Sequence, residues 1–222
     1  MSSFPDNGKI KVAVVTGQHP FHLPGFHALF RSLPEVDFYS QHLEDFVTDV
    51  AGVRDEYDTV VFYNHHQTTP GTEGDWWDRA TQHSFERFGT TSQGIFILHH
   101  GMSAFRQWPF WSELCGIEDR RLEFTMDQTV EVQIADPSHP ITSGLPAWEM
   151  VDETYLMPSA GDGSHILLTT EHPRSMKTLA WTRQHGSARV FCLQPGHGPG
   201  AFEHPTFRTI VGRGIGWTAG RV

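Results

Sequence analysis

Cysteine and positive charge are both scarce in this sequence. The 222 residues include 2 cysteines, Cys115 and Cys192, and 16 Lys and Arg against 26 Asp and Glu. A secreted protein of this size could pair two cysteines, but two buried free thiols are the simpler expectation. The formal charge of −10 leaves no basic footprint for DNA or an anionic membrane surface. We therefore expect neither nucleic acid nor a membrane as partner.

Long apolar runs are also missing. No stretch approaches the roughly 20 apolar residues that a membrane-spanning helix needs. Met1–Gly8 is short and polar, and the first apolar run, Ile10–Val15, contains Lys11, so we predict no secretory signal peptide and a cytoplasmic protein. The length, without repeats or linkers, favours one domain over residues 1–222, with residues 1–8 as a disordered N-terminal tail.

Histidine, by contrast, is abundant, with 15 residues. Its reference pKa is about 6.5, so the side chain changes charge within the physiological pH range. Protonating all 15 would add 15 charges to the formal −10 and give +5. The composition therefore predicts a net charge that changes steeply just below neutral pH.

The first half of the chain alternates apolar strands with amphipathic helices. Leu43–Tyr57 should hold a short helix, and a second helix should follow the Thr72-x-x-Asp75 capping box. This alternation is typical of a doubly wound, mostly parallel α/β sheet. The predicted buried strands are Ile10–Thr16, Val36–Ser40, Asp58–Tyr63 and Gly94–Leu98.

The second half is less regular. We expect its strands to form a meander that completes the same sheet. A terminal helix is predicted after Pro205, because apolar residues from Phe207 to Ile215 fall on one helical stripe. The predicted strands are Glu123–Ala135, Ile166–Thr170, Thr178–Trp181 and Arg189–Leu193.

Histidines follow four of the predicted strands within a few residues. The carboxyl ends of parallel strands meet at one edge of a sheet, where ligands of open α/β folds bind. A lone loop histidine is usually a solvated surface residue, but four strand ends with histidine are harder to attribute to chance. The polar residues concerned are His19 and His22, Asn64 with His65 and His66, His99 with His100, and Gln194 with His197.

Clustered imidazoles have two functional interpretations. They can bind a divalent metal through neutral nitrogens, or act as general acid and base near pH 7. The spacing does not select between them, since neither an HExxH motif nor a Cys/His zinc pattern is present. Whether the site binds a divalent metal cofactor therefore stays open.

Two other features could belong to the same site. Asp152-Glu153-x-Tyr155 could be a solvated turn, but apolar residues flank it, so we expect Glu153 to face inward, where a nearby histidine would keep it ionised. Trp108 lies in an aromatic cluster, 108–111, that mainly predicts core packing. At a pocket rim, its ring would suit a sugar.

These residues stand in an order that resembles the ThuA-like, or trehalose-utilisation, family. The resemblance covers nearly the whole chain. It implies the class I glutamine amidotransferase-like fold, a flavodoxin-like three-layer sandwich with a mostly parallel sheet. The matching segments are Gly94–His99, Trp108–Gly116, His139–Pro146, Asp152–Tyr155, Ala180-Trp181, Gly186–His197, Pro205–Phe207 and Gly214–Trp217.

The resemblance also implies that the chain lacks a nucleophilic cysteine. In amidotransferases the strand matching Gly94–Leu98 ends in a nucleophile elbow with cysteine, and here His99 takes that position. Glutamine hydrolysis through a thioester is therefore not expected. His197 matches the amidotransferase histidine, and His22 keeps the last position of a first loop that otherwise departs from the family. The family is linked to sugar dehydrogenases and oxidised (keto) disaccharides.

Three hypotheses are compatible with the sequence. The first is an enzyme acting on a sugar or keto-sugar, with the small-molecule carbohydrate as its partner. The second is a non-catalytic carbohydrate-binding or sensing protein, and the third is a structural metal site. The oligomeric state stays open, a homo-oligomer included. For the enzyme, the expected catalytic residues are His99, His197 and Glu153, and the expected substrate-binding residues are His22, Asn64, Trp108 and Tyr155.

Overall fold

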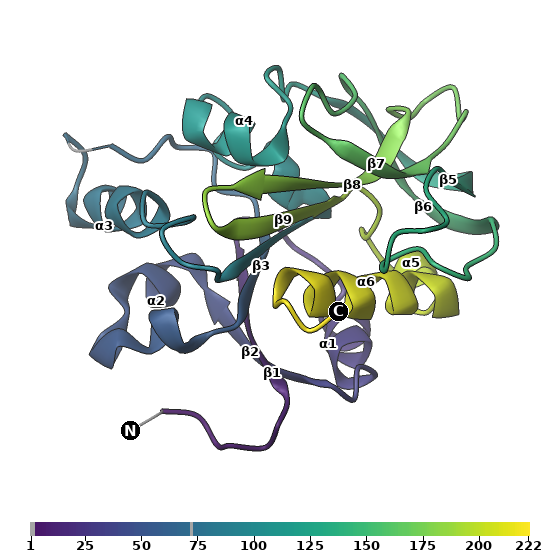
Figure 1. The fold of residues 1–222 in the computed structure, drawn as a ribbon. Helices are drawn as coiled ribbons and strands as arrows, with labels where there is room; N and C mark the ends of the chain where they lie inside the picture. Colours follow the sequence, from purple (N-terminus) through teal and green to yellow (C-terminus); the bar gives the residue numbers. More distant parts are fainter. Residues whose placement is uncertain (1–2, 72) are drawn as a thin grey trace.

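A nine-stranded mixed sheet forms the centre of the protein in a computed structural model that describes residues 3–71 and 73–222 (Figure 1). Its order is β2-β1-β3-β4-β9-β8-β7-β5-β6. The half from β2 to β9 is parallel, and the half from β9 to β6 is antiparallel. The bounds are β1 Ile10–Gly17, β2 Val36–His42, β3 Thr59–Asn64, β4 Gly94–Leu98, β5 Glu123–Ile134, β6 Trp148–Leu156, β7 His165–Thr169, β8 Thr178–His185 and β9 Ala188–Leu193.

Helices cover both faces of the sheet and complete three layers. Helices α1, α5 and α6 pack on one face, and α2, α3 and α4 pack on the other, each with its own apolar cluster. The strand order of the parallel half is that of flavodoxin-like sheets, which confirms the predicted fold class. The bounds are α1 Leu23–Arg31, α2 Leu43–Thr48, α3 Trp76–Phe85, α4 Pro109–Cys115, α5 Pro199–Phe202 and α6 Pro205–Thr218, with short 3₁₀ helices η1 Val50–Glu56 and η2 His99–Ser103.

Burial on both faces explains why the parallel strands lack an alternating polar pattern. In β1, Val12 and Val14 belong to the cluster under α1 and α6, whereas Ala13 and Val15 belong to the cluster under α2 and α3. Successive strand residues point to opposite faces, so a strand between two helical layers is apolar at every position. No helix in the described parts of the chain is long and apolar enough to cross a bilayer.

Several elements differ from the sequence-based expectation. Strand β6 was not predicted, because Asp152, Glu153 and Thr154 have the composition of a polar turn, although all three are buried. Helix α1 was not predicted either, since Pro24 and Gly25 stand in its first turn. Both segments are ordered by tertiary contacts that local composition does not reveal.

Helix α3 begins later than the capping box predicted. Its N-cap is Asp75, whose carboxylate accepts hydrogen bonds from the backbone N–H groups of Trp77 and Asp78. The predicted start at Thr72 lies outside the described residues. A carboxylate at the N-cap satisfies two orphan amides and favourably faces the helix dipole, so the helix starts at Trp76.

The expected N-terminal tail lies beside β2 and η1 over its described part. The ring of Phe4 lies 4.7 Å from that of Tyr39 and 5.0 Å from that of Tyr57. Ser3 donates hydrogen bonds to the Glu56 carboxylate from its backbone N–H and its hydroxyl. Residues 1 and 2 lie outside the described residues.

Candidate functional site

His99 stands at a sharp turn at the centre of the sheet. It directly follows β4, opens η2 and has a φ of 50°, a left-handed conformation that residues other than glycine rarely adopt. The turn brings the backbone of Gly101 against the Phe62 carbonyl, where a side chain would collide. A strand-to-helix turn of this kind raises one side chain above the carboxyl edge of a sheet, as a nucleophile elbow does.

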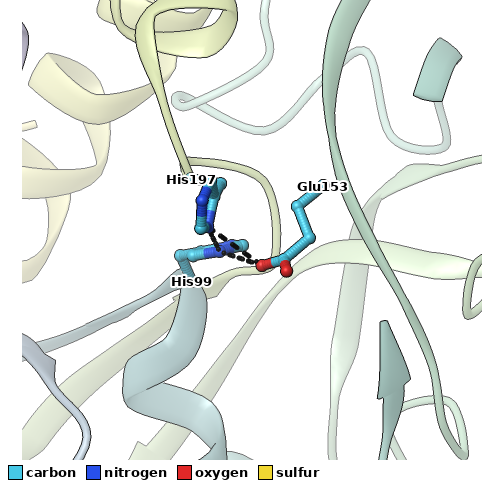
Figure 2. Close-up of side chains that lie close together, drawn as sticks. All are labelled: His99, Glu153 and His197. Carbon is cyan, nitrogen blue, oxygen red and sulfur yellow. Dashed lines mark hydrogen bonds and ion pairs between the residues drawn. The ribbon is translucent and has the colours of Figure 1, made fainter. Parts of the chain in front are cut away.

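Three side chains from distant parts of the chain meet at this edge (Figure 2). His99 Nε2 lies 2.9 Å from Glu153 Oε2, and His197 Nδ1 lies 3.0 Å from the same oxygen. The two imidazole nitrogens are 3.3 Å apart. The Tyr155 hydroxyl lies 2.9 Å from His99 Nε2, and its ring stacks on the His99 ring at 4.7 Å. The structure thus brings together the three predicted catalytic residues and Tyr155.

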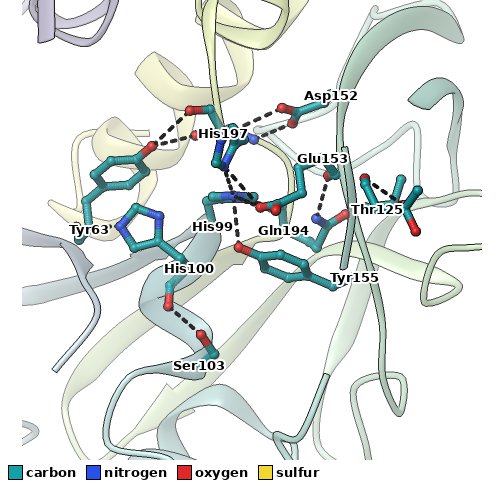
Figure 3. A network of polar contacts seen from close by, with 12 residues as sticks. Tyr63, His99, His100, Ser103, Thr125, Asp152, Glu153, Tyr155, Gln194 and His197 are labelled. Carbon is teal, nitrogen blue, oxygen red and sulfur yellow. Dashed lines mark hydrogen bonds and ion pairs between the residues drawn. The ribbon is translucent and has the colours of Figure 1, made fainter. Parts of the chain in front are cut away.

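Strand β6 contributes side chains to the site from both of its faces (Figure 3). Glu153 and Tyr155, two residues apart, share the face toward His99. Asp152 holds the loop after β9, because its carboxylate accepts hydrogen bonds from the backbone N–H of Gly196 at 2.6 Å and of His197 at 3.0 Å. This pair of bonds positions His197 beside Glu153.

The backbone just after β9 fixes the position of the proton on His99. Strands β4 and β9 pair Leu98 with Leu193, so the following residues, His99 and Gln194, are neighbours. His99 Nδ1 lies 2.6 Å from the Gln194 carbonyl oxygen, which only accepts, so Nδ1 carries the hydrogen and donates it. In the neutral ring, the lone pair of Nε2 therefore faces the Tyr155 hydroxyl, which can donate to it, as well as Glu153 and His197.

Charge in the cluster is concentrated on Glu153 and His197. Burial by itself would raise the pKa of Glu153, but its close contacts with His197 and His99 outweigh burial and hold that pKa below its usual range. The hydrogen bond to Glu153 raises the pKa of His197. Burial, together with the Glu153 charge, raises the pKa of Tyr155 well above 10. Glu153 is thus ionised and Tyr155 is a neutral hydroxyl at neutral pH.

Comparison with known proteins agrees with this geometry. The ThuA family, described as trehalose utilisation, matches residues 12–218. This chain belongs to the ThuA family. None of the curated proteins matches the ThuA-family chain.

Solved structures show the same fold. A ThuA-like protein of Parabacteroides merdae has a TM-score of 0.74 at 23% identity, covering 96% of this chain and 91% of that one. A ThuA-like protein of Bacteroides uniformis has a TM-score of 0.71 at 18% identity, covering 98% and 94%. PurLQS of Thermotoga maritima has a TM-score of 0.57 at 13% identity, covering 95% and 97%. The ThuA-family chain therefore shares its fold with ThuA-like proteins and with PurLQS.

More histidines of the ThuA-family chain lie beside the three-residue cluster. The rings of His19 and His100 stack at 4.1 Å, and His65 meets His19 edge-on at 5.3 Å. Burial lowers the pKa of all three rings, to about 4 for His65, so they are neutral near pH 7. His100 Nε2 donates to the Tyr63 carbonyl at 2.9 Å, whereas the buried Nδ1 atoms of His19 and His100 have no hydrogen-bond partner among the described residues.

His22 does not join the cluster. It is exposed, and its Nδ1 caps α1 by accepting a hydrogen bond from the Gly25 N–H at 3.2 Å. His19 is the histidine of this loop that reaches the site, with its ring 5.9 Å from that of His197. No sequence signal distinguishes the inward-facing histidine from the other, because the direction of a side chain in an irregular loop depends on the elements that pack against it.

Trp108 and Asn64 also lie elsewhere. Trp108 packs in the core against Phe85 and Phe105, so its assignment to the pocket rim was wrong. Asn64 is buried beside His66, with its amide nitrogen 3.3 Å from His66 Nδ1. Its neighbour His66 lines a separate cavity of about 190 Å³. Asn64 thus belongs to a second polar group next to the first.

The sequence analysis assigned no role to two positioning residues of the ThuA-family site. Asp152 anchors the loop of His197, and the Gln194 carbonyl sets the proton on His99. Both stand within sequence segments that the family resemblance covers. Their roles depend on strand pairing across the sheet, which a single sequence does not show.

Proposed function

We propose that this ThuA-family protein acts on a sugar or keto-sugar, such as trehalose or a related glycoside, and that His99, Glu153 and His197 form its reactive centre. The observation that carries the proposal is that these groups, from three separate elements, lie within 3.3 Å of one another. The family description, trehalose utilisation, supports the substrate class. The free buried thiols Cys115 and Cys192 favour a cytoplasmic place of action.

The proposed chemistry is proton transfer. An ionised carboxylate paired with an imidazole can take a proton from a sugar hydroxyl or from a carbon next to a keto group, and return it. His197 is the member open to solvent, with 26% of its side chain exposed, against 7% for Glu153 and none for His99. The substrate would therefore approach past His197.

Glutamine hydrolysis has no support in this site. The elbow residue is His99, and both cysteines are buried elsewhere, Cys115 in α4 and Cys192 in β9. A thioester mechanism needs a thiolate beside a base, and no thiol is placed there.

A carbohydrate-binding or sensing protein is the second candidate. It is favoured by the histidine at the elbow, where a covalent catalyst would carry a nucleophile. The neutral, partly exposed ring of His19, which stacks on His100, could contact a sugar without reacting with it. Fixed donors and flat rings are sufficient for binding.

The test is a turnover assay on trehalose, its keto derivative and related glycosides. His99→Ala and His197→Ala should each lower the rate by roughly 10²–10⁴-fold, because each removes a group that transfers or orients a proton. His83→Ala is the matched control, since His83 is exposed on α3, and it should keep the wild-type rate.

Two outcomes would change the conclusion. If the wild type turns over none of these sugars but binds one in a His99-dependent way, the protein is a binding protein. If it neither turns over nor binds any of them, the proposed substrate class is wrong.

A further inference from the structure

We infer that the same three side chains form a binding site for one divalent transition-metal ion, with His99 Nε2, a Glu153 carboxylate oxygen and His197 Nδ1 as ligands. The inference deepens the proposed function and rests on it for the role of the ion. Binding of the ion itself can be measured with no sugar present.

The spacing of the three atoms fits one face of a coordination sphere. Imidazole nitrogen and carboxylate oxygen bind such ions at about 2.0–2.2 Å, and two ligands at that distance lie about 3 Å apart when their angle at the ion is near 90–100°. The observed separations are 2.9, 3.0 and 3.3 Å. An ion could sit against this triangle with little movement of the side chains.

The position of the proton on His99 leaves the Nε2 lone pair available to a cation. The Gln194 carbonyl holds the hydrogen on Nδ1, which leaves the Nε2 lone pair of the neutral ring facing the Glu153 carboxylate at 2.9 Å. Two electron-pair donors at that distance repel unless a proton or a cation lies between them. A backbone carbonyl on the far nitrogen is also the usual way that proteins orient a metal-binding histidine.

Asp152 and Gln194 hold the three ligands in place, and the Gln194 carbonyl binds His99 Nδ1. Asp152 binds the backbone N–H groups of Gly196 and His197, and the Gln194 side chain donates to the Glu153 carbonyl at 3.2 Å. Outer contacts of this kind keep ligands in position before the ion arrives. The site is therefore preorganised rather than assembled around the ion.

The ligand set indicates the class of ion. Two imidazoles and one carboxylate suit Zn²⁺, Mn²⁺, Fe²⁺ or Co²⁺, whereas Mg²⁺ and Ca²⁺ prefer oxygen ligands alone. Three protein ligands on one face leave the remaining positions open on the exposed side of His197. A hydroxyl and an adjacent keto oxygen of one sugar could occupy two of them, and an ion there would polarise the keto group.

The experiment is a titration of the chelator-treated full-length protein with Co²⁺, followed by its visible absorption. We expect saturation at one ion per chain and release by the chelator. Glu153→Gln, which keeps the shape of the side chain, and His197→Ala should weaken binding by about 100-fold or more, because each removes a direct ligand. His83→Ala, on the exposed face of α3, should bind as the wild type does. Circular dichroism of each variant checks that it is folded.

The inference is wrong if the folded wild type shows no saturable Co²⁺ binding, or if Glu153→Gln and His197→Ala bind as tightly as His83→Ala. Metal analysis and sugar assays separate this result from the proposed function. Turnover that survives complete removal of the ion would keep the function and overturn the ion's role. One bound ion without any effect on sugars would keep the metal site and overturn the function.

Discussion

At the scale of single residues, the two thiols belong to the core. Cys115 and Cys192 are both fully buried, and Cys115 lies against the Met102 carbonyl. Burial raises the pKa of Cys115 to about 12 and that of Cys192 well above its ordinary value. Neither sulfur is a thiolate at neutral pH, so neither is a nucleophile.

Thiol reagents should therefore leave the native protein unchanged. We expect neither Cys115 nor Cys192 to react at pH 7 in the folded state, and both to react in denaturant, because access and ionisation both require unfolding. A colorimetric thiol assay with and without denaturant measures this. Fast modification of the folded protein, with loss of sugar turnover or binding, would contradict the assignment of both thiols to the core.

The residues that sequence reasoning could place are those fixed by strand ends. His99 and His197 come after buried strands, and the loops that leave parallel strands lie at one edge of the sheet. The direction of side chains in the loops could not be predicted from the sequence. His22 caps α1, and Trp108 packs in the core. Nothing in a loop's sequence specifies these choices, because they depend on the neighbouring helices.

At the scale of elements, β6 contributes most to the site. It carries Glu153 and Tyr155 on one face and Asp152 on the other, so one strand both supplies the carboxylate and holds the loop of His197. Strands of the parallel half were predictable from their apolar runs. Strand β6 was not, because its buried polar residues have the composition of an exposed turn.

Asp152→Asn should loosen the loop after β9. The carboxylate accepts two backbone N–H bonds, whereas an amide offers one acceptor and sets an NH₂ group against the other N–H. We expect a loss of about 2 kcal/mol or more in the free energy of unfolding, measured with urea. Glu149→Gln, an exposed carboxylate on the same strand, is the control and should change little. Equal stability of the two variants would show that Asp152 does not anchor the loop.

At the scale of the whole molecule, burial changes the expected titration. The composition predicted a steep change of charge as 15 histidines protonate together. Burial instead lowers the pKa of six of them, whereas the hydrogen bond to Glu153 raises the pKa of His197. The charge of the folded protein therefore changes less near pH 6.5 than the composition implies, and folding becomes linked to pH.

His66 gives the clearest case. Burial, with smaller effects from the charges of His42 and His65, lowers the pKa of His66 to about 4. Between pH 6.5 and 4, the unfolded chain therefore binds a proton at this histidine that the folded chain does not bind. Stability should then fall as the pH drops from about 6.5 to 4, by up to about 1.4 kcal/mol per pH unit. Asp75 and Asp78 line the same cavity as His66, and neither is replaced in the variants compared below.

Urea unfolding at several pH values measures this contribution. Between pH 6.5 and 5, we expect the wild type to lose about 1–2 kcal/mol more than His66→Gln. The exposed His83, replaced by Gln, should keep the wild-type dependence. The same pH slope in all three proteins would exclude His66 as the source.

The site joins two parts of the sheet that few backbone bonds connect. The hairpin of β5 and β6 pairs with β7 through Gln133 with Thr169 and Ile134 with Leu168, and the Ala135 N–H just after β5 donates to the Leu167 carbonyl. Anything bound at once by His99, Glu153 and His197 would be a cross-link between this hairpin and the parallel half. Local opening of the hairpin would then slow, and its amide protons would exchange more slowly with solvent, while those of β1 and β3 would keep their rates. Amide hydrogen exchange in the hairpin of β5 and β6 would thus report whether the site is occupied.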